Sequence, residues 1–178
     1  MKTTFIIIIL LYSTIAFGWH DTTTHRDITN YAITQFFDSD FLLESFTLGN
    51  ETKRAAIWLR DGSELEDQSN IFGFPSRSLN HFHDPTKPLA QAGLSDLVSG
   101  RSAVLWAQNP VAQSNTTGGD WTWQQVRNHY YNYLTAPDKT TEETSLVQTL
   151  LGLGYQMHLI EDMSQPNHVR NQLKEAML

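Results

Sequence analysis

The sequence predicts an all-α protein, a compact bundle of several helices joined by long loops. Apolar residues recur at helical spacing through much of the chain, and no segment shows the alternation of apolar and polar residues that is typical of a half-buried strand. Residues 62–94 are instead rich in Gly, Pro, Asn, Asp and Ser, a composition that favours loops. Helices that each have one apolar stripe are expected to bury it by packing on one another.

The chain begins with a short apolar leader. Lys2 precedes the run FIIIILLYSTIAF, and small residues follow at Ala16 and Gly18, which is the pattern of a secretory signal peptide. The run is shorter than the roughly 20 apolar residues that a membrane span needs. We therefore expect cleavage of residues 1–18 and a secreted or periplasmic protein that begins at Trp19. An uncleaved N-terminal anchor is the alternative.

The remaining residues, 19–178, are enough for one domain with a sizeable core. The formal net charge of the chain is −7, and it becomes −8 without Lys2, the one charged residue of the leader. This charge argues against a protein that grips nucleic acid with a basic face. The chain has no cysteine, so disulfides and cysteine-based zinc sites are excluded, and a metal would be held by His, Asp, Glu or backbone groups.

Three helices are expected in the first two thirds of the chain. The segment 24–37 has Thr24 as its candidate N-cap. Its apolar stripe consists of Ile28, Tyr31, Ala32 and Phe36. The segment 51–62 is expected to be a short helix that ends at Gly62, and the segment 94–110 another that ends at Pro110.

Two longer helices are expected towards the C-terminus. One runs from Trp121 to Thr135, with Asp120 as its cap and Pro137 beyond its end. Most of its aromatic residues are expected in the core: Trp121, Trp123, Tyr130, Tyr131 and Tyr133. The other begins at a capping box of Thr140 and Glu143 and ends at Pro166. Its core stripe consists of Leu146, Leu150, Leu153, Met157 and Ile160.

Candidate metal ligands lie on this last helix. His158 and Asp162 are four residues apart, so their side chains lie one turn apart on one face and can reach the same cation. Asp162 has two oxygens and could bridge to a second cation. His168 follows the break at Pro166, displaced enough to serve a neighbouring site. Alone, such a pair is more often a solvated helix face.

A second group of candidates lies in the loop-rich segment. It consists of Asp67, His81 and His83. In an extended chain the two histidines around Phe82 point to the same side, so one could bind a metal while the other packs or donates a supporting hydrogen bond. Each histidine alone could equally be a surface or core residue.

The N-terminus of the processed chain offers further ligands. The α-amine of Trp19 has a pKa near 7.7–8.0 in an ordinary terminus, so a metal competes easily with its proton, and its carbonyl oxygen is within chelating distance. His25 could add an imidazole to the same ion. His20 and His129 are expected to be surface residues.

In this combination the chain resembles the zinc-dependent phospholipase C family, which shares its fold with the S1/P1 nucleases. The resemblance rests on Trp19, on His25, on ELED with Asp67, on NHFHDP with His81, and on GYQMHLIEDMSQPNH. These motifs occur in order over nearly all of residues 19–178. The resemblance implies an all-α bundle of the phospholipase C / P1 nuclease type, with long metal-binding loops and three zinc ions in a cleft.

The resemblance also implies ligand sets. Asp67, His81, His158 and Asp162 would hold one zinc ion. Trp19, His25 and the bridging Asp162 would hold a second. His168 would hold a third together with a later His and Glu. Asp67 would also orient or deprotonate the attacking water, and Asp61 is a competing candidate for its place.

The sequence departs from the family pattern in two places. No histidine follows His168, and Glu175 is too close to complete the third site. We therefore expect the domain of residues 19–178 to be incomplete at its C-terminus, with the third zinc site completed if the chain continues; loss of the third site is the alternative. His83 stands where the family commonly has an aromatic residue, and is interpreted as a supporting or substrate-facing residue.

These inferences predict a secreted zinc-dependent phosphodiester hydrolase, most simply a phospholipase C that acts on phospholipid head groups during transient contact with a membrane surface. Zinc-activated water would attack phosphorus, and the metal ions would offset the charge of the phosphodiester. Two alternatives stay open, a single-strand nuclease of the S1/P1 type that binds nucleic acid and a non-catalytic zinc-binding helical module. No protein partner is inferred.

Overall fold

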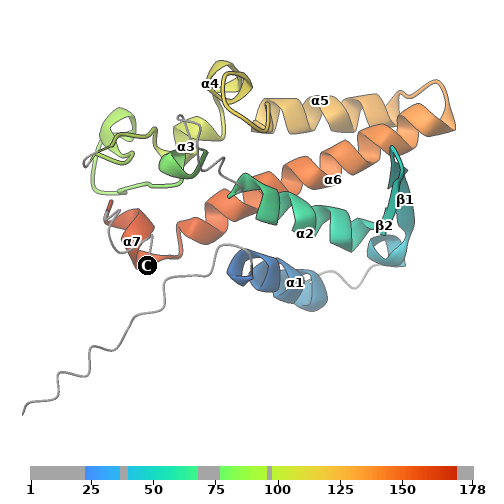
Figure 1. Ribbon diagram of the computed structural model, residues 1–178, viewed down its shortest axis with the longest axis horizontal. Coiled ribbons are helices and arrows are strands. Elements are labelled where there is room, and N and C mark those ends of the chain that lie inside the picture. Colours follow the sequence, from blue (N-terminus) through green and yellow to red (C-terminus); the bar gives the residue numbers. More distant parts are fainter. Residues whose placement is uncertain (1–22, 37–39, 68–76, 96–97, 172–178) are drawn as a thin grey trace, which may run out of the picture.

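The structure, a computed structural model, describes residues 23–36, 40–67, 77–95 and 98–171. Its elements are predominantly helical, in agreement with the helical class that the sequence predicts (Figure 1). In chain order they are α1 (Thr24–Phe36), the 3₁₀ turn η1 (Asp40–Leu43), β1 (Ser45–Leu48), β2 (Glu51–Arg54), α2 (Ala55–Glu66), the 3₁₀ turns η2 (Arg77–Asn80) and η3 (Leu89–Gln91), α3 (Ala103–Trp106), α4 (Pro110–Ser114), α5 (Trp123–Leu134), α6 (Lys139–Asp162) and α7 (Pro166–Val169).

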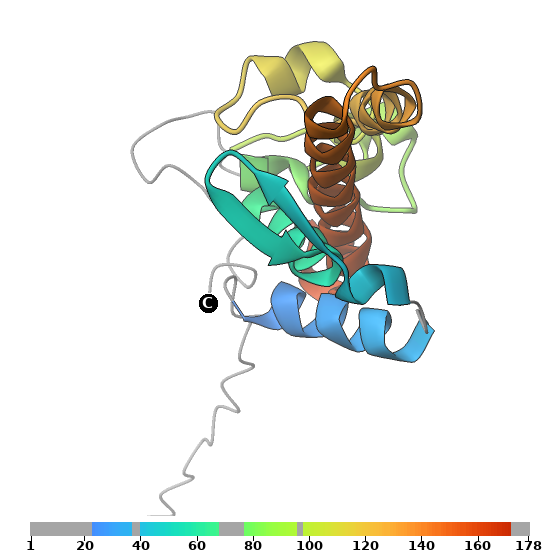
Figure 2. The same ribbon diagram turned by 90° about the vertical axis from the view of Figure 1, so that its right-hand side faces the viewer.

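The long helix α6 is the centre of the described fold. It packs along α2 on one side and α5 on another, and α1 contacts both α2 and α6 (Figures 1 and 2). The main core cluster therefore draws its side chains from α1, η1, β1, α2 and α6. It contains Ile33, Leu42, Phe46, Ala55, Trp58, Leu59, Leu146, Val147, Leu150 and Leu151.

The predicted core stripe of α6 is correct in part. Leu146 and Leu150 are buried, and Leu153 and Met157 pack against the core from partly buried positions. Ile160 is instead 63% exposed. A helix with neighbours on several sides buries more than one stripe, so its pattern does not point to a single face.

Two glycines let α2 and α6 approach closely. A Cβ atom on Gly62 would stand 2.1 Å from the carbonyl oxygen of Leu151, and one on Gly154 would stand 2.1 Å from that of Leu59. The prediction that Gly62 ends its helix is therefore wrong, because α2 continues through Gly62 to Glu66. Gly62 is a packing residue at the crossing of two backbones.

A short β-hairpin precedes α2, where the sequence predicts no strand. Strands β1 and β2 pair antiparallel, with Ser45 opposite Arg54, and Gly49 in the turn has a positive φ of 61°. Residues 51–54 are thus a strand and not the first turn of a helix. The indole Nε1 of Trp58 donates to the Phe46 carbonyl oxygen and ties α2 to the hairpin.

Helix α1 buries a different stripe from the predicted one. His25, Thr29 and Ile33 are buried, whereas Tyr31 is 64% exposed. The helix begins at Thr24, which is its first helical residue. Two of the three buried residues are polar, so hydrophobic periodicity alone identified the wrong face.

Other helix ends differ from the expected ones. Pro110 begins α4 where a single helix over 94–110 was expected to end, since proline is favoured in the first helical turn. The hydroxyl of Thr122, and not Asp120, caps α5. Asp138 caps α6 by accepting a hydrogen bond from the Thr141 amide, in place of the capping box predicted two residues later.

Helix α5 exposes most of the aromatic residues that were expected in the core. Trp123 is 48% exposed, Tyr130 50% and Tyr131 65%, while Trp121 and Tyr133 are partly buried. In the part of the chain that the structure describes, no helix has both the length and the apolar character to cross a bilayer. The predicted signal peptide and Trp19 lie outside the described residues.

Candidate metal centre

Six of the seven predicted metal ligands lie close together at one end of α6. His25 comes from α1, Asp67 from the C-terminal end of α2, and His81 from the residue after η2. His158 and Asp162 come from the last turns of α6, and His168 from α7. The fold thus brings together side chains from four helices and a loop, separated by more than a hundred residues in sequence. Trp19, the seventh, lies outside the described residues.

Asp162 is at the centre of this group. Its Oδ2 atom lies 3.0 Å from Nδ1 of His81 and 3.1 Å from Nε2 of His158. Its Oδ1 atom lies 3.3 Å from Nε2 of His25 and 3.7 Å from Nε2 of His168. The two carboxylate oxygens therefore face two different sets of imidazoles, which is the arrangement that a residue bridging two cations requires.

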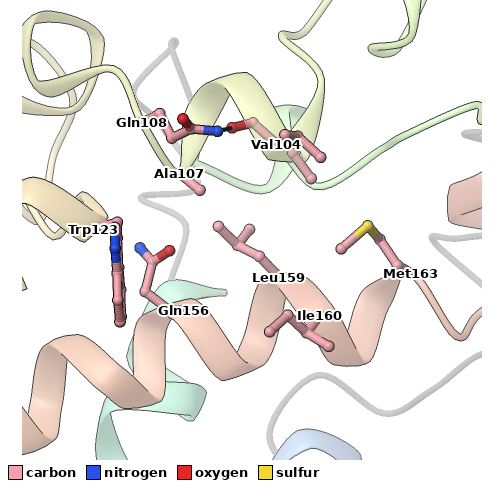
Figure 3. A pocket seen from close by; sticks show the side chains of 9 residues that line it. Val104, Ala107, Gln108, Trp123, Gln156, Leu159, Ile160 and Met163 are labelled. Carbon is pink, nitrogen blue, oxygen red and sulfur yellow. Dashed lines mark hydrogen bonds between the residues drawn. The ribbon is translucent and has the colours of Figure 1, made fainter. Parts of the chain in front are cut away.

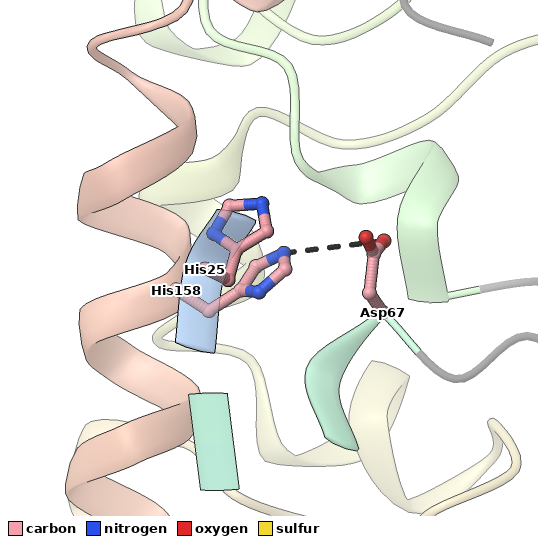
Figure 4. A group of neighbouring side chains, drawn as sticks. All are labelled: His25, Asp67 and His158. Carbon is pink, nitrogen blue, oxygen red and sulfur yellow. Dashed lines mark ion pairs between the residues drawn. The ribbon is translucent and has the colours of Figure 1, made fainter. Parts of the chain in front are cut away.

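Two overlapping groups, which share His158, are each compact enough for one metal ion. His81, His158 and Asp162 form one group, and the ligand atoms within each group lie within 4.8 Å of one another. His25, Asp67 and His158 form the other (Figure 4). Oδ1 of Asp67 lies 3.6 Å from Nδ1 of His81 and 4.0 Å from Nε2 of His158. His25 and His158 stack, with ring centroids 3.8 Å apart.

The state of Asp162 Oδ2 indicates that this group suits a cation. The atom is buried beside Nδ1 of His81 and Nε2 of His158, yet these nitrogens pair with each other at 3.2 Å and neither meets Oδ2 in hydrogen-bond geometry. A buried carboxylate oxygen without a well-aligned donor is unfavourable, and a metal ion that binds the same oxygen and the neighbouring nitrogens removes that cost. These buried His and Asp residues could therefore hold a metal ion.

The other nitrogen of each imidazole contacts a neighbouring acceptor, which orients the imidazole. Nδ1 of His158 lies 2.8 Å from the carbonyl oxygen of Ser63, and Nδ1 of His25 lies 2.9 Å from Oε2 of Glu161. Nε2 of His81 lies 3.3 Å from Oε1 of Glu66. Each of these imidazoles thus has one nitrogen within hydrogen-bonding distance of a buried acceptor, while its other nitrogen faces Asp162. Such outer contacts are typical of metal-binding histidines.

Glu66 also belongs to a buried ionic network. It accepts hydrogen bonds from Nε and Nη2 of Arg77 at 2.9 and 2.6 Å, and from the Trp106 indole at 2.7 Å. Arg77 in turn donates to the Gly119 carbonyl oxygen and to Oε1 of Gln113. The network ties η2, α3 and the 113–119 segment to α2 beside the candidate centre.

Sequence reasoning missed Glu66 and Glu161. Each is the immediate neighbour of a predicted ligand, Asp67 and Asp162, and this adjacency is the one signal of their role in the sequence. Successive helical residues point in directions about 100° apart, so adjacency alone does not predict that both side chains reach one site.

Two histidines of the group are protonated at neutral pH when no metal is bound. Burial disfavours the imidazolium of His25, but contacts with Asp162 and Glu161 outweigh it and raise its pKa to about 9. His81 behaves in the same way, and its contacts with Asp162 and Glu66 raise its pKa to about 10. Protons thus supply the positive charge that a divalent cation would otherwise supply among these carboxylates.

Two further members of the cluster, Asp162 and His168, have lowered pKa values. Burial favours the neutral acid of Asp162, but the nearby His158 and His25 hold its pKa well below the ordinary value. Burial lowers the pKa of His168 to about 4, so this ring is neutral at physiological pH. Both are therefore in the protonation state that metal binding requires.

The remaining candidates lie away from the group or at its edge. Asp61, the competitor of Asp67, forms ion pairs with Lys53 and Arg60, and the structure brings Asp67 to the histidines instead. Nδ1 of His83 lies 2.9 Å from the Ser102 hydroxyl. His129, expected at the surface, is partly buried and contacts Gln125 and Trp121. His20 lies outside the described residues.

A groove of about 240 Å³ lies on a different face of α6 (Figure 3). It is mostly apolar, and its walls come from α3 and the segment that follows it, from α5 and from α6. The residues that line it are Ala103, Val104, Ala107, Gln108, Trp123, Gln156, Leu159, Ile160 and Met163. None of the candidate ligands lines this groove, so it is separate from the candidate metal centre.

Comparison with known proteins gives no identification. No family model, curated protein or solved structure matches the chain. The candidate metal centre therefore rests on the chemistry and geometry of its own residues.

Proposed function

We propose that the protein is a zinc-dependent phosphodiester hydrolase, and specifically a phospholipase C that acts on phospholipid head groups. The observation that carries this proposal is Asp162, whose two oxygens face different imidazoles in a buried cluster. Nitrogen and carboxylate donors without cysteine suit zinc in a hydrolytic centre. An acidic chain binds an anionic substrate more readily through bound cations than through its own side chains.

In this proposal, Asp67, His81, His158 and Asp162 hold one zinc ion. His25 and Oδ1 of Asp162 hold a second, together with the amine and carbonyl of Trp19. When bound, the zinc ions supply a water of lowered pKa and offset the charge on the phosphodiester. His168 faces the same carboxylate at 3.7 Å and is available to a third ion.

Asp67 has a position suited to the reacting water. Its side chain is 20% exposed, whereas those of His25, His81, His158 and Asp162 are at most 3% exposed. Water and a substrate phosphate can therefore approach Asp67 more easily than the other groups. Its carboxylate would orient the attacking water and accept its proton.

The exposed aromatic residues support a lipid substrate. Trp123, Tyr130 and Tyr131 project from α5, and Ile160 is exposed on α6. Aromatic and apolar side chains at the surface are suited to a membrane interface. The net negative charge weakens the case for a polynucleotide, although the same aromatic rings could stack on bases.

Hydrolysis assays on the zinc-loaded protein test this proposal. We expect turnover of phosphatidylcholine vesicles and of bis(p-nitrophenyl) phosphate that a chelator abolishes and added zinc restores. Asp67→Asn should lower the rate by about 10²–10⁴-fold, the usual contribution of a positioned general base. Asp61→Asn, on the same helix but paired with Lys53 and Arg60, is the matched control and should retain activity.

Other outcomes would contradict the proposal in distinguishable ways. Preference for single-stranded DNA over lipid would indicate a nuclease. Zinc binding without turnover of any of the three substrates would indicate a non-catalytic zinc-binding module.

A further inference from the structure

Glu161 is a buried carboxylate with donors from two other helices. It lies on α6 directly before Asp162 and is 8% exposed. Its Oε1 accepts from the Thr29 hydroxyl at 2.8 Å, and its Oε2 accepts from the Ser63 hydroxyl at 3.2 Å. The same Oε2 lies 2.9 Å from Nδ1 of His25. The Glu161 carboxylate on α6 thus makes two contacts with side chains of α1 and one with a side chain of α2.

The contact between Glu161 and His25 determines which nitrogen of the His25 ring can bind a metal ion. A carboxylate oxygen accepts hydrogen bonds, so Nδ1 of His25 must carry a proton to satisfy it. The ring is then turned so that Nε2 lies 3.3 Å from Oδ1 of Asp162. The stacking of His25 on His158, at 3.8 Å between centroids, fixes the ring plane.

We propose that Glu161 is a positioning residue of the candidate centre: by holding Nδ1–H of His25, it makes Nε2 the nitrogen that binds the metal. This inference rests on the proposed function, since it concerns the ligand of the proposed second ion. Glu161 itself does not touch that ion.

Ser63 connects this contact to the other half of the centre. Its hydroxyl donates to Glu161, and its carbonyl oxygen receives Nδ1–H of His158. Both rings therefore have Nδ1 against a buried acceptor and present Nε2 to Asp162. A single residue of α2 thus contacts His158 directly and His25 through Glu161.

The surroundings of Glu161 provide a conservative variant and a disruptive one. In Glu161→Gln, the amide oxygen can still accept from His25, and the amide nitrogen can donate to the Thr29 hydroxyl, which can turn to accept. Glu161→Leu has a similar size but no acceptor. Comparing the two variants separates loss of charge from loss of the hydrogen bond.

The test loads the protein with ¹¹³Cd and labels its imidazoles with ¹⁵N. Scalar coupling to cadmium identifies which ring nitrogen of each histidine binds the metal. We expect coupling at Nε2 of His25 in the native protein and in Glu161→Gln. In Glu161→Leu we expect this coupling to be lost or to move to Nδ1. Zinc affinity, measured by chelator competition, should fall by about 10- to 100-fold in Glu161→Leu, and by less in Glu161→Gln.

Three results would overturn the inference. One is Nε2 coupling and native zinc affinity in folded Glu161→Leu, and another is ligation through Nδ1 in Glu161→Gln. Absence of cadmium coupling from every histidine of the native protein would overturn the proposed metal centre as well. If Glu161→Leu does not fold, Glu161→Asp replaces it. Aspartate keeps the charge, but its side chain is one methylene shorter, so the carboxylate lies farther from His25.

Discussion

Asp162 is the residue that joins the two halves of the candidate centre. Oδ2 faces His81 and His158, and Oδ1 faces His25. An asparagine would keep one oxygen and place a donor amide where the other oxygen was. We therefore expect Asp162→Asn to lower the bound zinc by more than one ion per chain, measured by elemental analysis of the folded protein.

A change of the same kind on the outer side of α2 is the control for that experiment. Asp61 pairs with Lys53 and Arg60, so Asp61→Asn should leave the zinc content unchanged. Loss of a single ion, or of none, from Asp162→Asn would show that Asp162 does not bridge two sites.

The raised pKa values of His25 and His81 predict a pH dependence of the metal-free protein. Each has a folded pKa, about 9 and about 10, above the ordinary value of 6.5. The folded state therefore binds more protons than the unfolded state between these values, and stability falls as pH rises in that range. The contribution is complete below about pH 6.5 and is lost as pH rises through 9 and 10.

Thermal unfolding of the chelator-treated protein from pH 6 to pH 10 measures this effect. We expect the midpoint to decrease with pH, and His81→Gln to make the decrease shallower. Asn132→Ala, at an exposed position of α5, changes no titratable group and should leave the slope unchanged. A midpoint that rises from pH 7 to pH 10 would be incompatible with these two ion-paired histidines.

At the residue scale, the side chains that can bind a metal ion directly could be selected from the sequence. The histidines and aspartates of the cluster could be selected because few other residue types bind metals when cysteine is absent. Glu66 and Glu161 could not, because their role depends on burial against His81 and His25. Whether the selected residues bind metal stays a prediction.

At the scale of elements, the crossing of α2 and α6 holds the cluster together. Ser63 and Asp67 lie on one side of it, and His158 and Asp162 on the other. Gly62 and Gly154 allow the close approach of these helices, since a Cβ atom at either would clash with a backbone carbonyl. A change in the spacing of the two helices therefore changes the distances between ligands.

Gly154→Ala tests this coupling between packing and metal binding. In an exposed helix the change would add about 1 kcal/mol of stability. Here we expect a loss of about 1–3 kcal/mol, because overpacking forces the helices apart. Denaturant unfolding measures the loss, and zinc affinity should decrease in parallel.

Asn132→Ala on the exposed face of α5 is the control for helix propensity and should be neutral or stabilising. A stabilised Gly154→Ala with native zinc affinity would show that the crossing tolerates a wider spacing.

The positions of helices were predictable where the local spacing of apolar residues determines them. Long helices were expected near α1, α5 and α6, and the structure contains them. The hairpin was missed because each strand has four residues, too few for alternation to stand out. Gly62 was taken as a helix end because a close helix crossing favours the same residue as a C-cap does.

For the whole molecule, the predicted metal ions would act as cross-links between distant segments. The candidate ligands join α1, α2, α6, α7 and the residue after η2. A ligand that binds only the folded state stabilises it, by about 4 kcal/mol at 1,000 times its dissociation constant. Removal of zinc from the protein should therefore lower its thermal midpoint by roughly 8–16 °C.

Differential scanning calorimetry before and after chelation measures this shift, and added zinc should reverse it. Asp162→Asn should respond much less than the native protein. Identical midpoints with and without zinc would mean that the cluster does not bind the ion in the folded state.

At this scale the helical class was predictable, because apolar spacing dominates the sequence and the described chain is mostly helical. Which side chains lie at the surface was not predictable. Trp123, Tyr130 and Tyr131 of α5 have core-like side chains but are 48%, 50% and 65% exposed, whereas Tyr133 packs against the core. Which face a helix turns outward depends on how its neighbours pack, which periodicity does not specify.

The most direct measurement of the central claim is zinc K-edge X-ray absorption on the zinc-loaded protein. The account predicts at least two zinc ions per chain, with nitrogen and oxygen at about 2.0–2.2 Å and outer-shell scattering from more than one imidazole per ion. An all-oxygen shell without imidazole scattering, or fewer than two bound zinc ions per chain, would contradict it.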